Sequence, residues 1–322
     1  MSNRGYGLKK ITGLLGPFIG LVLVITLFSL MPEISDRFLR LGNIKNVATQ
    51  SVIVALCALG MTLIIVSGGI DLSAASNLAM SCVLVAFAIN AGLTPLLAAL
   101  VGVTTGGLVG FLNGFLITRL RVVPFIVTLG MMGITRGLAK WVARNQKIDA
   151  PLSWLNDLMV RTPEPSWLIV SPGIWVMVFF SLVMAVVLRK TVFGRHVFAV
   201  GSNELTARLC GIRTERVKVL VYTISGLLCG LAGVMEFSRL TVGDPTVAMG
   251  LELDIIAAVV IGGGSLSGGE GSILGTLVGV FIMAFLRNGC TMMGWPNYFQ
   301  EIIIGAIIIA AVTLDRLRHR QE

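Results

Sequence analysis

The residues best suited to chemistry in this chain lie in two glycine-rich segments that interrupt apolar sequence. Residues 67–73 hold Asp71 and Ser73, and residues 262–272 hold Ser265. Carboxylate and hydroxyl groups can cap a helix N-terminus or hydrogen-bond a polar solute, and glycines let the backbone turn sharply. Non-helical backbone at membrane depth is tolerated only where it is packed in protein or lines a water-filled cavity. The two segments, called the first and second breaks below, therefore indicate a solute pathway.

Eight residues in and beside the breaks are our candidates for lining this pathway. They are Gly68, Gly69, Asp71, Ser73, Asn77, Gly263, Gly264 and Ser265. Two roles stay open for the polar members. Asp71 either caps the helix that follows, which is the commoner use, or contacts the solute, and Asn77 either binds solute or holds helices together.

The second break also contains the sequence Leu-Ser-Gly-Gly-Glu at residues 266–270, which is similar to the signature loop of ATP-binding-cassette ATPases. The chain has no G-x-x-x-x-G-K-[ST] loop to hold phosphates, so we exclude nucleotide binding by this chain. Ser267 and Glu270 have instead the spacing of a capping box, which predicts that they cap a helix beginning at Ile273.

Catalytic and metal-ligating sets are missing from the sequence. It shows neither a hydrolase triad nor paired catalytic carboxylates, and His196 and His319 have no partner ligands at metal spacing. The five cysteines fall in apolar or basic segments, with no pair placed for a disulfide. We therefore expect no catalytic residues, no metal site and no cofactor in this chain, and no enzymatic activity.

Composition defines the elements that must position the breaks. With 55% hydrophobic residues, 13% charged residues and a mean hydropathy of +0.90, the chain cannot hide its apolar surface in one soluble core. We predict an all-α polytopic membrane protein in which residues 1–322 form a single transmembrane domain. A helical span needs roughly 20 apolar residues. The apolar runs predict about ten spans, at 11–31, 47–66, 74–91, 95–118, 124–143, 168–188, 219–237, 252–264, 273–288 and 299–314.

Two of these spans are weak, and two segments look repeated. Arg136 and Lys140 shorten the apolar run in 124–143, and 252–264 is too short to cross alone, so either is a full span, a half-helix or a tilted interfacial segment. Residues 66–77 can be laid over residues 261–272 with one gap. This similarity indicates a possible internal repeat, which transporters often contain.

The basic residues predict the orientation in the membrane. They concentrate at both termini, in the turn at 119–121 and above all in the loop at 189–218, which holds seven Lys and Arg residues. By the positive-inside rule, these segments and both termini are cytoplasmic, and the loops at 32–46 and 144–167 lie outside. The net charge of +9 is thus a topology signal, and we expect no nucleic-acid partner.

Three segments in order resemble a known family. They are ALGMTLIIVSGGIDLS at 58–73, GSNELTARLCGI at 201–212 and ELDIIAAVVIGGGSLSGGEG at 252–271. They look like the permease subunits of bacterial monosaccharide ABC importers, within the ribose and branched-chain amino-acid permease superfamily. The resemblance runs from about residue 45 to residue 315.

This resemblance implies an inner-membrane permease that imports a monosaccharide, either a ribose-like pentose or a hexose. It implies three partners: an ABC ATPase subunit on the cytoplasmic face, which holds ATP and magnesium, a periplasmic or lipid-anchored sugar-binding protein, and a second permease copy. Glu204, Ala207, Arg208 and Gly211 resemble the coupling element that docks on the ATPase, although Leu205 and Thr206 depart from its E-A-A form. Arg208 and its basic neighbours either contact the ATPase or only enforce topology.

Two other functions remain open from the sequence. One is a permease of the same type for another small solute, such as a branched-chain amino acid, a nucleoside or a signalling sugar. The other is an ion-coupled secondary transporter that works alone. Coupled carriers usually hold ionisable residues near the midplane, and Asp71 is the one good central candidate, which argues against the second function.

Overall fold

The computed structural model describes residues 3–160 and 168–319, and almost all of its regular structure is helical. Its elements in chain order are α1 (Asn3–Ser29), α2 (Ser35–Phe38), α3 (Leu41–Val66), α4 (Ala74–Asn90), α5 (Pro95–Leu120), α6 (Pro124–Val142), β1 (Ile148–Asp149), η1 (Trp154–Met159), α7 (Pro172–Lys190), α8 (Val192–Ser202), α9 (Glu204–Leu209), α10 (Thr214–Leu240), β2 (Val242–Gly243), α11 (Leu251–Ile261), α12 (Ile273–Met292) and α13 (Asn297–His319). The predicted all-α polytopic class is confirmed.

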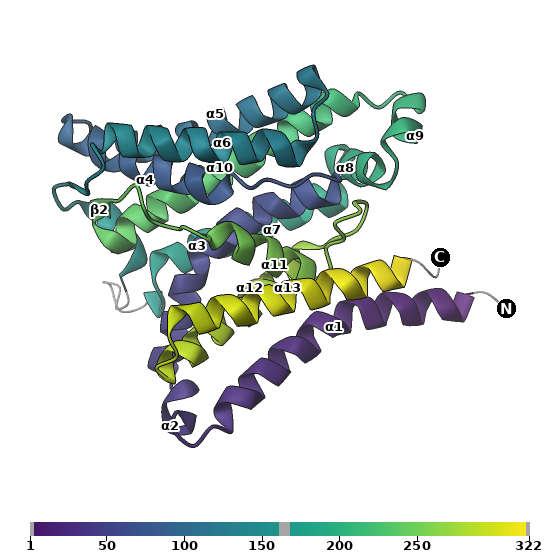
Figure 1. Cartoon of the computed structure of the whole chain (residues 1–322), viewed down its shortest axis with the longest axis horizontal. Helices are drawn as coiled ribbons and strands as arrows, with labels where there is room; N and C mark the ends of the chain where they lie inside the picture. Colours follow the sequence, from purple (N-terminus) through teal and green to yellow (C-terminus); the bar gives the residue numbers. More distant parts are fainter. Residues whose placement is uncertain (1–2, 161–167, 320–322) are drawn as a thin grey trace.

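The long helices lie side by side in one bundle (Figure 1). The first turn of α1 and the last turn of α13 lie at the same end of the bundle as α8 and α9. Helix α2 and strand β2 lie at the opposite end. We call these the α9 end and the β2 end. Helix α3 is the most enclosed, because it packs against α7, α10, α11 and α12.

Glycine faces allow the closest helix contacts in the bundle. On α5 and α10, Gly106 and Gly110 face Gly226 and Gly230, and a Cβ at Gly230 would lie 2.7 Å from the carbonyl oxygen of Gly102. Small residues at these positions bring two backbones together, as is usual in membrane helix packing. The α5–α10 pair is thereby fixed as a rigid unit beside α4.

Every predicted span falls on a helix. Within the described residues, α3, α5, α7, α10 and α12 are each long and apolar enough to cross a membrane. The segment at 252–264 is the short α11, which ends at the second break. The segment at 124–143 is a continuous helix, α6, rather than a half-helix. The predicted loop at 189–218 is not irregular, because α8, α9 and the first turn of α10 occupy most of it.

The loops at the β2 end are tied to one another. Strands β1 and β2 pair antiparallel, with Ile148 opposite Gly243 and Asp149 opposite Val242. Just beyond β2, the Asp244 carboxylate accepts hydrogen bonds from the Thr246 amide at 2.8 Å and hydroxyl at 2.6 Å. Burial raises the pKa of Asp244, but the bonds from Thr246 and the charge of Lys147 outweigh it, so its pKa lies below the ordinary carboxyl value. This loop therefore stays ordered ahead of α11 at neutral pH.

Candidate transport site

The helices before the two breaks end in the same backbone geometry. After α3, the amides of Gly68 and Gly69 donate to the carbonyls of Ile65 and Ile64, both at 2.9 Å. After α11, the amides of Gly263 and Gly264 donate in the same register to the carbonyls of Val260 and Val259, again at 2.9 Å. Gly68 and Gly263 adopt positive φ angles of 79° and 89°, as a glycine C-cap requires. The ends of α4, α9 and α12 close with the same pair of backbone bonds, so this geometry is a common helix C-cap, and the internal repeat stays a prediction.

The two breaks touch each other and the end of α8. The amide of Gly269 in the second break donates to the carbonyl of Val66, the last residue of α3, at 2.9 Å. A Cβ at Gly268 would lie 2.6 Å from the carbonyl oxygen of Gly201 and 3.0 Å from the Cα of Gly68. The three segments that carry the family resemblance therefore meet, backbone against backbone, at the α9 end.

Asp71 organises the first break. One carboxylate oxygen of Asp71 accepts from the Ser73 amide at 2.8 Å and from the Ser73 hydroxyl at 2.6 Å. The Asn113 amide on α5 donates to the Ser73 hydroxyl oxygen at 2.8 Å. Asp71 therefore stabilises the turn just ahead of α4, two residues before its N-cap, Ser73, whose side chain makes no capping bond itself. This is a local structural role of the kind expected for a capping residue.

A second contact set fixes the same break from α6 and α10. The Tyr222 hydroxyl donates to the carbonyl of Ile70 at 3.2 Å, and the Thr128 hydroxyl donates to that carbonyl at 3.3 Å. A Cβ at Gly69 would lie 2.6 Å from the Tyr222 hydroxyl. Gly69 therefore lets the first break pack closely against Tyr222 of α10.

The capping box predicted from Ser267 and Glu270 is wrong. Helix α12 is capped by Ser272, whose hydroxyl accepts from the Gly275 amide at 3.0 Å. Upstream, the amide of Gly268 bonds to the carbonyl of Ser265 at 3.0 Å, and the amide of Ser265 bonds to the carbonyl of Glu270 at 3.2 Å. These bonds close residues 265–270 into a loop of their own, so the helix begins only after that loop is complete.

The predicted pathway residues are grouped but unequally accessible. Asp71, Ser73, Asn77 and Ser265 are each at most 1% exposed, whereas the backbone at Gly68 and Gly263 is exposed. In this conformation, glycine backbone at Gly68 and Gly263 is accessible, as are Ser267 and Glu270. Asp71 and Ser73 bind each other, and the Asn77 amide donates to the carbonyl of Gly106 at 3.1 Å. Direct solute contact by Asp71, Ser73, Asn77 or Ser265 stays a prediction that requires the helices to separate.

The coupling residues are brought together on α9. Glu204 accepts from Lys218 on α10 at 2.6 Å and lies 3.4 Å from Arg208. Burial raises the pKa of Glu204, but the hydrogen bond and charge of Lys218 and the charge of Arg208 outweigh it, so its pKa is lowered. Ala207 is buried, and Gly211 ends the element with a φ of 85°. These residues fix α9 against the bundle.

The outward face of α9 was missed from the sequence. Leu205 and Leu209 are 70% and 81% exposed, one turn apart on the same face. Two exposed leucines in the most basic loop of a chain are unusual for a solvated surface, and their spacing matches an apolar contact face. Leu205, which departs from the family form, thus belongs to this face.

Three charged groups in apolar segments have partners that the sequence analysis did not foresee, and two of them, Asp254 and Arg287, were not singled out there. Arg287 on α12 pairs with Asp254 on α11 at 2.7 Å, near the β2 end of both helices. Arg136 on α6 donates to the carbonyls of Pro245 and Val247, both at 2.8 Å, and so holds the loop before α11. Charged residues within membrane segments generally pair with another charge or with a backbone carbonyl. A charge inside a predicted span was therefore the sequence signal that pointed to these contacts.

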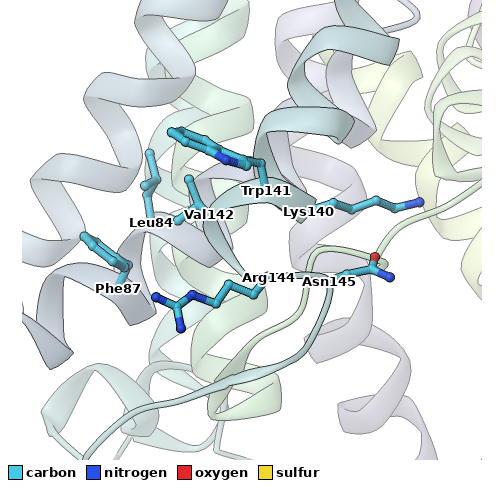
Figure 2. Close-up of a pocket in the computed structure, with 7 residues that line it drawn as sticks. All are labelled: Leu84, Phe87, Lys140, Trp141, Val142, Arg144 and Asn145. Atoms are coloured by element: carbon cyan, nitrogen blue, oxygen red, sulfur yellow. The ribbon is translucent and has the colours of Figure 1, made fainter.

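Two hollows in the described part of the chain lie at opposite ends of the bundle, and no residue of either break lines them. At the β2 end, a hollow of about 710 Å³ between α4 and α6 is lined by Leu84, Phe87, Lys140, Trp141, Val142, Arg144 and Asn145. In Figure 2, the Arg144 side chain extends toward Phe87, while the Lys140 side chain extends away from it. Exposed Trp and basic residues near helix ends are typical of the membrane interface. At the α9 end, a polar hollow of about 430 Å³ includes Glu204, Arg208 and Lys218.

Comparisons with known proteins identify the family. A family model described as "Branched-chain amino acid transport system / permease component" matches residues 43–312. The chain is 41% identical over 302 residues to the ribose import permease protein of Bacillus subtilis (strain 168), covering 94% of this chain and 92% of that protein. It is 38% identical over 304 residues to the L-arabinose ABC transporter permease protein of Azospirillum brasilense, covering 94% of this chain and 88% of that protein.

A third relative carries a different solute. The chain is 32% identical over 299 residues to the autoinducer 2 import system permease protein of Photorhabdus luminescens, covering 92% of this chain and 89% of that protein. No similar solved structure was found. Because the family model spans most of the sequence and the relatives align over nearly all of it, this membrane-embedded chain belongs to the family of branched-chain amino acid transport system permease components.

Proposed function

We propose that this protein is the permease subunit of an ABC importer that moves a monosaccharide, a ribose-like pentose or a hexose, into the cytoplasm. The observation that carries the proposal is the alignment over 94% of the chain with the ribose permease and with the L-arabinose permease. The geometry supports it, because the three segments that resemble monosaccharide permeases converge at one junction. The whole chain then acts as one transmembrane permease domain.

Energy would come from a separate ABC ATPase that binds ATP and magnesium and docks on α9. The exposed leucines of α9 offer an apolar contact face, and Arg208 beside them offers a charge. The basic loop around α9 favours a cytoplasmic position, because positive loops are retained on that side. The α9 end and both termini then face the cytoplasm, and the chain lies in the bacterial inner membrane.

The β2 end would receive the sugar from a periplasmic or lipid-anchored binding protein. Its loops are held in place by the β1–β2 pair and by Arg136, which provides an ordered surface for docking. A second permease copy would complete the pore as a homodimer. The binding protein would do most of the selection, because Asp71, Ser73 and Asn77 are buried in this conformation and offer the solute no accessible polar side chain.

A signalling sugar is the second candidate substrate. It is favoured by the 32% identity to an autoinducer 2 import permease over 92% of the chain. A branched-chain amino acid, suggested by the family description, and a nucleoside remain further candidates. An ion-coupled carrier that works alone is disfavoured, because family members are permease components of transport systems.

The test is reconstitution with an ATPase and a binding protein, which are first sought among the genes that neighbour the gene of this chain. The binding protein is first screened by calorimetry against ribose, L-arabinose, hexoses, autoinducer 2 and leucine. Uptake of the bound ligand into liposomes is then measured with and without ATP. We expect ATP-dependent uptake of a monosaccharide. Selective uptake of leucine, or uptake without the ATPase, would contradict the proposal.

A further inference from the structure

We propose that Gly201 is the positioning residue through which α9 moves both breaks as one unit. This inference rests on the proposed docking of an ATPase on α9. It adds a defined route from the docking element to the two breaks, and it names the residue on which that route depends.

Gly201 lies where only a backbone fits. A Cβ at this position would clash with the carbonyl oxygen of Val66 and would lie 2.7 Å from the amide nitrogen of Gly269. From the other side, a Cβ at Gly269 would lie 3.1 Å from the Cα of Ser202. The last turn of α8 is therefore enclosed by the end of α3 and by the second break. A close-packed junction of this kind transmits displacement, because it has no void in which movement can be lost.

The connection from α9 to Gly201 is short and hydrogen-bonded on both sides. Asn203 alone separates α8 from α9. Its side chain accepts from the Thr206 amide at 2.8 Å, and its own amide donates to the carbonyl of Ala199 at 3.1 Å. A rotation of α9 is thus passed to the last turn of α8 instead of being absorbed by a flexible linker.

The first break has a second connection to α9, and this connection bypasses Gly201. Glu204 bonds to Lys218, and one turn further along α10 the Tyr222 hydroxyl bonds to the carbonyl of Ile70. The second break contacts α8 at Gly201 and Ser202. Loss of the Gly201 contact should therefore uncouple the second break more strongly than the first.

The first experiment compares Gly201→Ala with Gly133→Ala in the assembled complex. Gly133 on α6 has open space around its Cβ position, so it is a matched control. Both variants carry Ser267→Cys as an exposed reporter in the second break, and Cys210→Ser to remove the exposed native thiol. With the ATPase bound, we expect ATP to change the Ser267→Cys labelling rate in the control and to change it at least tenfold less in Gly201→Ala. Equal ATP responses in the two variants would overturn the inference.

The second experiment remains valid if Gly201→Ala folds poorly. Ser202→Cys and Gly269→Cys, whose Cβ positions lie 3.2 Å apart, are joined by oxidation with copper phenanthroline in the Cys210→Ser background. If α8 and the second break move as one unit, uptake by the oxidised complex should be within twofold of uptake by the same complex after reduction. Uptake that returns only on reduction would show that the segments slide past each other, and would overturn the inference.

The proposed function is judged separately by the complex without substitutions. If that complex shows no ATP-dependent labelling change and no uptake, the assignment as an ATPase-driven permease fails. If it shows both, and Gly201→Ala behaves like Gly133→Ala, the inference about Gly201 alone fails.

Discussion

At the scale of single residues, the first break depends on buried acceptors and on glycines. Asp71 accepts two bonds from Ser73, and Ile70 presents its carbonyl to Tyr222 and Thr128. A buried donor that loses its acceptor costs roughly 1–3 kcal/mol. The polar groups of the break therefore hold the resting conformation together, whatever they do during transport.

Asp71 offers a direct test of that role. Asp71→Asn keeps the oxygen that accepts from Ser73 and should retain most uptake and thermal stability. Asp71→Leu removes the acceptor and should lower stability by about 1–3 kcal/mol, with most uptake lost. The measurements are melting in detergent and sugar uptake. Loss of uptake in Asp71→Asn at normal expression and stability would show that the charge itself is needed.

At the scale of elements, the structure shows α8 and α9 as ordered helices between the two halves of the chain. Apolar periodicity predicted the spans, because lipid requires long apolar helices. Ser272 as the true cap of α12 could not be predicted, because the loop at 265–270 closes on itself through backbone bonds. The contact of Gly201 with Val66 and Gly269 joins segments far apart in sequence, and a local pattern carries no sign of it.

The exposed leucines of α9 predict which side chains bind the ATPase. Leu205→Ser and Leu209→Ser should each weaken binding of the ATPase about tenfold, since burying a leucine contributes about 1.5–3 kcal/mol and tenfold in affinity is about 1.4 kcal/mol. Leu152→Ser is the matched control, because Leu152 is 78% exposed near the β2 end. Affinity is measured by titrating the ATPase onto the permease in nanodiscs. Unchanged affinity in both α9 variants would exclude this face as the docking surface.

At the scale of the whole molecule, the bundle has two different ends. The two breaks meet at the end where both termini lie. The α9 end carries the junction of the breaks, and the β2 end carries the ordered loops (Figure 1). The basic residues predicted this polarity, because they are concentrated around α9. The orientation of the bundle in the membrane stays a prediction.

Sidedness can be measured with two cysteines. In the Cys210→Ser background the four remaining native cysteines are buried. Arg213→Cys, just after α9, should react with an impermeant maleimide only from the cytoplasmic side, and Asp157→Cys in η1 only from outside. Both native residues are exposed, so access is not limited by burial. Labelling of Arg213→Cys in intact cells would show that this residue lies outside, and would contradict the predicted topology.

The most direct test of the central claim is the energy source of uptake. Liposomes that contain this chain and its ATPase are supplied with the loaded binding protein, and labelled monosaccharide is counted inside with ATP and magnesium, or with a proton or sodium gradient alone. We predict accumulation only with ATP, and loss of accumulation when the ATPase is omitted. Accumulation driven by an ion gradient without the ATPase would contradict the claim that this chain is an ATPase-driven sugar permease.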